Sequence, residues 1–194
     1  GEWLTFGTHT NIIKTKERMS NKFYTMRTPE EVEGLEDMIS WINEIRPTSE
    51  MRMIEIGSYI GESTMIFAKH FKEVVSVDPY MDNYDVTDLA CSFAPFDDVY
   101  SEFLRNTLDI PNIKSIRDTS ERSFSILKER EWDLVYIDGL HTVEGVMFDV
   151  GNYRTIISKG GFVSGHDYGW GNIRHTIGIQ FDDKVDGVFK DHSW

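Results

Sequence analysis

An apolar run, a glutamate and two glycines occur together in residues 53–64, which read MIEIGSYIGEST. A turn built on Gly57 and Gly61 after a buried strand brings the backbone close to a ligand at the start of the next helix. A dinucleotide-binding turn needs a glycine at its middle position, where the pyrophosphate contacts the backbone, and Tyr59 stands there instead. A P-loop is excluded as well, because no Gly-Lys-Ser/Thr follows. The turn therefore favours a ligand other than a nucleotide phosphate.

Two carboxylates narrow the choice of ligand. Glu55 stands at the end of the first strand beside a helix N-terminus, where it would repel a phosphate and attract an ammonium group. Asp78 closes the second strand in VVSVDPY, where a carboxylate can accept hydrogen bonds from both hydroxyls of a ribose. The combination predicts a nucleoside that lacks phosphates and carries a positive charge.

Two further pairs of polar residues follow later strands. Asp138 and His141 come after one predicted strand, and His166 and Asp167 come after the next. Ligands of an open parallel sheet bind at the carboxyl ends of its strands, so both pairs are expected to face one crevice. Carboxylates and imidazoles that converge there indicate a divalent-metal site or a base for a substrate hydroxyl.

An alternation of strand and helix patterns positions these residues. Short β-branched runs alternate with segments of helical periodicity, which is typical of an α/β domain with a mostly parallel sheet. We therefore predict a Rossmann-like sheet with helices on both faces. The predicted strands are residues 51–57, 73–80, 112–118, 132–139 and 160–167.

The N-terminal part has a different pattern. The segment Thr28–Glu31 provides a capping residue, a proline at the first helical position and a glutamate at the third. An amphipathic helix is expected to begin there and to end before Pro47. Residues 1–27 lack periodicity and are interpreted as an arm or lid. The chain is thus divided into an N-terminal arm and helix, residues 1–47, and a ligand-binding domain, residues 48–194.

Composition limits the kind of partner. The 194 residues have a formal net charge of −13, which repels nucleic acid and favours a small cationic or neutral ligand. No apolar stretch approaches the ~20 residues of a membrane-spanning helix, so no membrane partner is expected. Cys91 is the single cysteine, which excludes an internal disulfide and predicts a cytoplasmic location. A small-molecule acceptor is the expected partner, and homo-oligomer formation is left open.

These motifs resemble those of class I S-adenosylmethionine-dependent methyltransferases. Residues 55–64 are similar to the first motif of that family, residues 77–78 to its second-strand acidic motif, and residues 117–120 to the segment that meets the adenine. The similarity extends to one branch, which includes macrocin-type sugar O-methyltransferases and cephalosporin-hydroxylase-like proteins. The segments that match this branch are YIDGLH (136–141), Glu144, Asp149, KGGF (159–162) and GHDY (165–168). The match spans roughly residues 50–194 in order and spacing.

The resemblance implies a cofactor and an activity. The cofactor would be S-adenosylmethionine, and a methyl group would pass to an oxygen of a small molecule such as a sugar. The cofactor-binding residues that the resemblance and the residue types imply are Glu55, Gly57, Ser58, Tyr59, Gly61, Ser63, Asp78, Asp118, Thr119 and Asp138.

The resemblance also implies a metal site and a base. In the sugar methyltransferases, the aspartate of the fourth-strand motif and an acidic pair after the fifth strand bind Mg²⁺, and the histidine after that aspartate is the base. Carried over, Asp138 and Asp167 become metal ligands, and Asp138 and His141 the catalytic residues. His166 stands where those enzymes have a carboxylate. The predicted metal set is therefore Asp138, His166 and Asp167, and its imidazole favours a transition metal over Mg²⁺.

The C-terminal part departs from the family pattern. The family fold carries further strands after its fifth helix. Residues 172–181 are predicted to form that helix, whereas residues 185–194 provide one strand only. Trp170, after the fifth strand, is the aromatic residue expected to contact the substrate.

Other functions stay open at this point. A nicotinamide-dependent oxidoreductase is disfavoured by Tyr59 between the glycines. A nucleoside-binding protein without methyl transfer would use the same pocket. A cephalosporin-hydroxylase-like protein with a different reaction is compatible with the same motifs.

Overall fold

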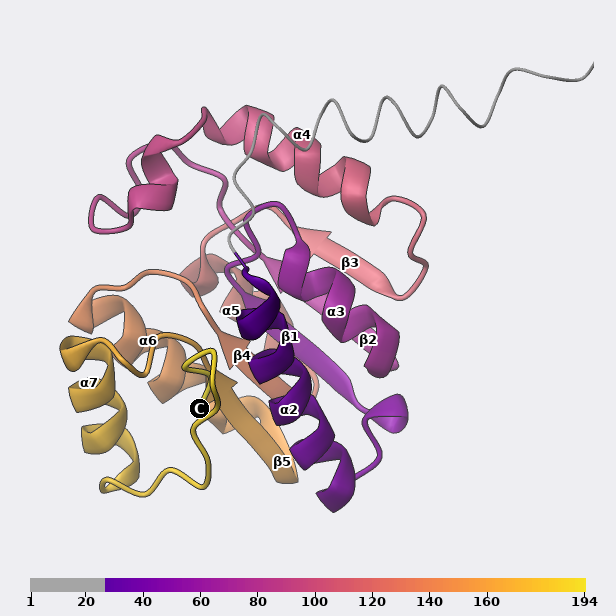
Figure 1. Cartoon of the computed structure of the whole chain (residues 1–194), viewed down its shortest axis with the longest axis vertical. Helices are drawn as coiled ribbons and strands as arrows, with labels where there is room; N and C mark the ends of the chain where they lie inside the picture. Colours follow the sequence, from indigo (N-terminus) through magenta and orange to yellow (C-terminus); the bar gives the residue numbers. More distant parts are fainter. Residues whose placement is uncertain (1–26) are drawn as a thin grey trace, which may run out of the picture.

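The computed structural model describes residues 27–194, and the fold is a single five-stranded sheet with helices on both faces (Figure 1). The strand order is β3-β2-β1-β4-β5, and each neighbouring pair is parallel. The strands are β1 (Arg52–Ile56), β2 (Glu73–Val77), β3 (Ile113–Ile116), β4 (Trp132–Ile137) and β5 (Ile157–Gly165). The first four lie within predicted strands, β5 overlaps the predicted strand 160–167 and begins earlier, and the predicted fold class is confirmed.

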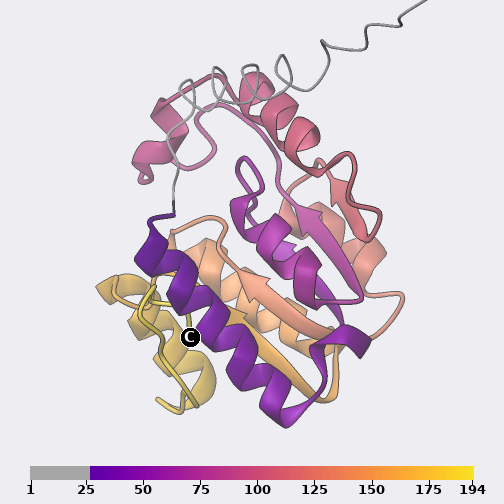
Figure 2. The same ribbon diagram turned by 45° about the vertical axis from the view of Figure 1, so that its right-hand side comes forward.

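Helix α2 precedes the first strand, the other helices follow strands along the chain, and together they cover the sheet from both sides. They are α2 (Pro29–Ile45), α3 (Glu62–His70), α4 (Phe96–Thr107), α5 (Ser120–Leu127), α6 (Val143–Tyr153) and α7 (Gly171–Phe181). Helices α2 and α3 pack on one face, whereas α5 and α6 pack on the other with α7 beside them (Figures 1 and 2). Three short 3-10 segments complete the order: η1 (Thr48–Glu50), η2 (Leu89–Ser92) and η3 (Arg154–Ile156). None of these helices has the length and apolarity to cross a lipid bilayer.

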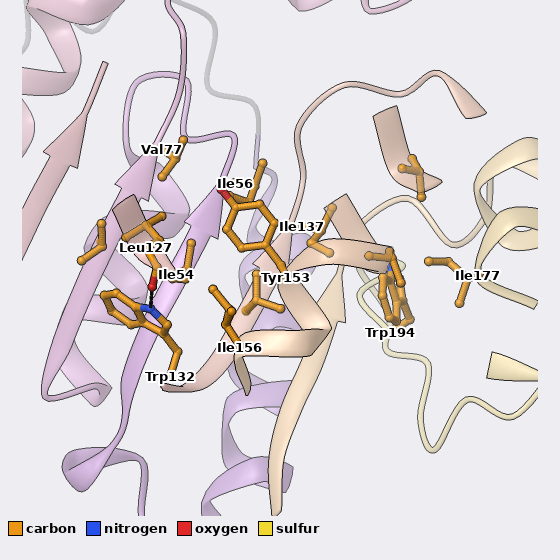
Figure 3. Close-up of a cluster of buried hydrophobic side chains, with 14 of the residues drawn as sticks. Ile54, Ile56, Val77, Leu127, Trp132, Ile137, Tyr153, Ile156, Ile177 and Trp194 are labelled. Atoms are coloured by element: carbon orange, nitrogen blue, oxygen red, sulfur yellow. Dashed lines mark hydrogen bonds between the residues drawn. The ribbon is translucent and has the colours of Figure 1, made fainter. Parts of the chain in front are cut away.

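The core on the two faces of the sheet forms two layers because side chains alternate along each strand, and a third, smaller cluster forms around Phe103 of α4. Ile54 and Ile56 of β1 belong to the layer under α5 and α6, which Figure 3 shows around Tyr153 and Trp194. In that layer, the Nε1 of Trp132 donates a 2.9 Å hydrogen bond to the carbonyl of Leu127. The opposite layer lies under α2 and α3 and includes Met53, Val74, Leu134 and Tyr136.

The predicted N-terminal helix is confirmed and belongs to the core of the domain. Thr28 caps α2 in a capping box with Glu31, and Pro29 is its first residue. The apolar stripe of the helix is fully buried against the sheet through Leu35, Met38, Ile39 and Ile42. The predicted arm of residues 1–27 lies outside the described residues, apart from Arg27.

The strand predicted for residues 185–194 is wrong. Helix α7 forms as predicted, but the chain after it is irregular, and only Trp194 pairs with β5 through two hydrogen bonds to Gly165. A tight turn interrupts the pairing, because the amide of Phe189 donates to the carbonyl of Ser193. The tail then runs beside α2 (Figure 2), where Asp191 lies against Gly34 so closely that a side chain would not fit there.

Candidate active site

A cavity of about 300 Å³ opens at the carboxyl ends of the strands. The strand order reverses between β1 and β4, and this switch point is where open parallel sheets bind their ligands. The wall is built by the segments that follow β1, β2, β4 and β5, with Arg27 and Glu31 at the start of α2 and Ser120 of α5. The cavity therefore occupies the place that the sequence predicted for the ligand.

The turn after β1 depends on close backbone contacts. Gly57 has a φ of 83°, and a Cβ there would lie 1.9 Å from the carbonyl oxygen of Asp138. Gly61 has a φ of 86° and begins α3 against Phe103 of α4. Tyr59 also has a positive φ, 47°, which is strained for a residue with a side chain. Gly57 and Tyr59 line the cavity, whereas Gly61 serves helix packing.

Asp78 fixes this turn from the neighbouring strand. Its Oδ2 accepts hydrogen bonds from the amides of Ser58 and Tyr59 at 3.0 and 3.1 Å, and its Oδ1 accepts one from Tyr80 at 2.9 Å. The residue lines the cavity. A carboxylate has about four acceptor sites, so the bonds from these described residues leave Oδ1 able to accept from a ribose hydroxyl.

Glu55 does not lie in the cavity wall, which corrects the sequence prediction. Side chains alternate along β1, so Glu55 points to the same face as Met53, under α3. Its two carboxylate oxygens accept 2.5 Å hydrogen bonds from the hydroxyls of Ser63 and Thr64. Burial raises the pKa of Glu55 to about 7, and the bonds from the two hydroxyls offset this only in part.

This buried carboxyl predicts a pH-dependent stability. The raised pKa means that the folded state binds the proton more tightly than the unfolded state, whose carboxyl titrates near 4.5. Wild-type stability is therefore lost as the pH rises from about 4.5 through about 7. Glu55→Gln has a neutral side chain of the same shape at every pH. Its free energy of unfolding, relative to that of wild type, should therefore increase by about 2 kcal/mol between pH 5 and pH 8.

Urea unfolding at the two pH values measures this difference. Glu129→Gln, at an exposed position after α5, is the matched control and should show no such trend. A stability difference between Glu55→Gln and wild type that stays constant with pH would contradict the raised pKa.

Of the predicted adenine segment, residues 117–120, only Ser120 lies in the cavity wall. Thr119 caps α5 by accepting a hydrogen bond from the amide of Arg122, and Asp118 accepts one from the amide of Thr119. Neither residue lines the cavity, whereas Ser120 does. Asp118 and Thr119 stay out of the wall because their side chains accept hydrogen bonds from the backbone at the start of α5.

Four polar side chains converge at the β4–β5 end of the cavity. The Nε2 of His141 lies 2.8 Å from Oδ2 of Asp167 and 4.0 Å from Oδ1 of Asp138. His166 approaches the same carboxylates, with its Nδ1 3.3 Å from Asp167 and 3.7 Å from Asp138. One ligand atom each of Asp138, His141 and Asp167 lie within 4.8 Å of one another, which is close enough to share a metal ion. The predicted metal set named His166 as the imidazole ligand, whereas the converging atoms belong to Asp138, His141 and Asp167, and His166 lies beside them.

Asp85 orients His141, and the sequence analysis did not predict it as a site residue. Its Oδ2 lies 2.9 Å from the Nδ1 of His141 and also accepts the amide hydrogen of that residue. Bonds from His141 and Thr87 outweigh burial and lower the pKa of Asp85 to about 2, so it is ionised. A carboxylate on one ring nitrogen directs the other nitrogen, Nε2, toward Asp138 and Asp167.

Both histidines of the cluster are cationic at neutral pH. Burial would lower the pKa of His141, but its bond to Asp167, the charge of Asp138 and its bond to Asp85 raise it to about 10. The pKa of His166 is raised to about 9, because the charge of Asp138 and the contact with Asp167 likewise outweigh burial. His141 must therefore lose a proton before Nε2 can bind a metal ion or accept a proton from a substrate.

Two further residues complete the wall. Arg27 forms 3.3 Å contacts with Asp138 and Asp191 and was not predicted. Trp170 was expected to contact the substrate, and its ring centroid lies 5.0 Å from that of His141. Trp170 lines the cavity with 42% of its surface exposed, which leaves an aromatic face for a ligand.

Comparison with known proteins places this chain in a family. The family model described as "Methyltransferase domain" matches residues 54–168, which is more than half of the chain. The chain therefore belongs to the methyltransferase domain family. No curated protein sequence matches it.

Solved structures share the fold at low sequence identity. A SAM-dependent methyltransferase from Agrobacterium tumefaciens has a TM-score of 0.54 and 11% identity over 79% of this chain and 52% of its own. The chain thus spans about half the length of that protein. Aeropyrum pernix fibrillarin with bound S-adenosyl-L-methionine has a TM-score of 0.55 and 16% identity over 84% of this chain and 74% of its own. A putative caffeoyl-CoA O-methyltransferase from Staphylococcus aureus has a TM-score of 0.52 and 15% identity over 91% of this chain and 80% of its own.

Proposed function

We propose that the protein is an S-adenosylmethionine-dependent methyltransferase that acts on a hydroxyl oxygen of a small molecule, such as a sugar. The observation that carries this proposal is that Asp78, bonded to the turn after β1, shares one cavity with the cluster of Asp138, His141 and Asp167. In this proposal, the cofactor and the acceptor oxygen would bind side by side at the switch point of the sheet.

The charge of the cavity supports a cationic donor. Among the described residues, seven carboxylates line it, whereas a single arginine and no lysine do. The carboxylates belong to Glu31, Glu62, Asp78, Asp85, Asp88, Asp138 and Asp167. Such a wall disfavours a pyrophosphate or a nucleic-acid backbone and suits a sulfonium nucleoside.

We place each part of the cofactor from the order of the strands. Asp78 at the end of β2 would accept hydrogen bonds from the ribose, and Ser120 beside β3 would border the adenine. The methionyl end would lie over Gly57 and Asp138, between β1 and β4. This direction points the reactive methyl group toward His141 and Trp170.

The donor set fits a divalent metal ion. Two carboxylates and one imidazole offer converging atoms, and Asp85 orients the imidazole from its other nitrogen. A mixed oxygen and nitrogen set suits Mn²⁺ or Zn²⁺ better than Mg²⁺, which prefers oxygen ligands. Such an ion would lower the pKa of an acceptor hydroxyl and fix its position. With a metal ion bound, His141 would be a ligand, whereas without metal its Nε2 would serve as the base.

The remaining residues position the acceptor. Methyl transfer requires an oxygen aligned with the donor methyl group and relieved of its proton. Trp170 provides an aromatic surface beside His141, and Asp167 stabilises positive charge on the His141 ring. Binding tests the first half of the proposal, because S-adenosylhomocysteine should bind to this cavity and NADH should not.

A further inference from the structure

Arg27 is a buried cation at the entrance to α2. Only 9% of its surface is exposed, and it lines the cavity. Its Nη2 lies 3.3 Å from Oδ2 of Asp138 and donates to the hydroxyl of Tyr136, while its Nη1 lies 3.3 Å from Oδ2 of Asp191. A guanidinium has five N–H donors, and these bonds to described residues account for three of them.

The position of Arg27 coincides with one end of the proposed cofactor. It contacts Asp138, whose backbone touches Gly57 at the switch point between β1 and β4. The two carboxylate oxygens of Asp138 face different partners. Oδ2 faces Arg27, and Oδ1 faces the two histidines. The cavity wall therefore presents a positive and a negative group side by side, 3.3 Å apart.

We infer that Arg27 binds the carboxylate of the amino-acid end of the methyl donor and so sets the specificity for that end. The inference rests on the proposed function. An α-amino acid is a zwitterion, and the ion pair of Arg27 and Asp138 is complementary to it, with the ligand carboxylate on Arg27 and the ammonium on Asp138. The ligand carboxylate needs such a partner, because seven carboxylates line the same cavity. In residues 27–194, the other cations of the wall are His141 and His166, and both already contact Asp167.

A purely structural role makes a different prediction. Arg27 joins α2 to the C-terminal tail through Asp191, which is fully buried in its side chain. If this link were its sole task, losing Arg27 would weaken every ligand of the cavity by the same factor. The two roles are therefore separated by ligands that differ only in the carboxylate.

The experiment is calorimetric titration with S-adenosylhomocysteine and with its decarboxylated analogue, which keeps the amine. Wild type should prefer the first ligand by about 10- to 100-fold, the scale of a charge-assisted hydrogen bond. Arg27→Gln should reduce that preference to within about threefold, mainly by weakening S-adenosylhomocysteine. Arg27→Lys keeps the charge and should retain part of the preference.

Further variants keep the result interpretable. Arg27→Gln leaves Asp191 without its cation, so the double variant Arg27→Gln/Asp191→Asn tests the same point with both charges removed. Arg46→Gln is the matched control, because Arg46 pairs with Asp133 at the opposite end of the sheet. An unchanged preference in Arg27→Gln and in the double variant, or no preference in wild type, would overturn the inference. If wild type bound neither ligand, the proposed function itself would fail.

Discussion

His141→Ala is expected to lower turnover at least about 100-fold while the affinity for S-adenosylhomocysteine changes less than about threefold. The ring of His141 is bonded to Asp85 on one side and Asp167 on the other, and its Nε2 faces the centre of the cluster. Either proposed role, metal ligand or base, depends on that nitrogen. Loss of the ring should therefore affect the chemical step and spare the cofactor.

Manganese binding separates the two roles. If His141 is a ligand, His141→Ala should weaken Mn²⁺ binding, measured by electron paramagnetic resonance, together with turnover. If it is the base, Mn²⁺ affinity should be retained while turnover falls. His175→Ala, at an exposed position on α7, is the matched control and should leave both quantities unchanged. Undiminished turnover in His141→Ala would remove the residue from the chemistry.

Gly57→Ala is expected to destabilise the fold by about 3 kcal/mol. The φ of 83° disfavours any side chain, and the new Cβ would meet the carbonyl oxygen of Asp138 at 1.9 Å. That carbonyl belongs to the backbone beside β4, so relief requires β1 and β4 to separate. Asp138 and the glycine turn would move with them, and cofactor binding should fall as well.

Urea unfolding measures the effect against Gly151→Ala. Gly151 lies in α6, and a Cβ there would meet nothing nearer than a Gln180 side-chain atom at 3.8 Å. Alanine in a helix is favoured over glycine, so this control should stabilise slightly. A loss below about 1 kcal/mol for Gly57→Ala would show that the turn relaxes without moving β4.

The sheet was predictable because its signals are local. Each β-branched run and each helical stripe is readable within a few residues, and the Thr28 capping box fixed the start of α2. The site residues that follow β1, β2, β4 and β5 were found for the same reason, since parallel strands bring their carboxyl ends together.

Other parts of the site depend on contacts that no local pattern encodes. Asp85 lies 56 residues from His141, and Arg27 lies 111 residues from Asp138. The prediction of a C-terminal strand was wrong because Asp191 and Ser193 form hydrogen bonds with Arg27 and Tyr136, and the segment does not pair along a strand. The error at Glu55 has a local cause. Side chains alternate along a strand, so Glu55 lies on the same face as Met53, under α3, and away from the cavity.

The central claim is that this cavity binds the nucleoside of the methyl donor and of its demethylated product through Asp78 and its turn, and one titration tests it. S-adenosylhomocysteine should bind wild type at least about 100-fold more tightly than NADH, and Asp78→Ala should weaken it at least about tenfold. Tighter binding of NADH, or equal affinity of wild type and Asp78→Ala for S-adenosylhomocysteine, would contradict the account.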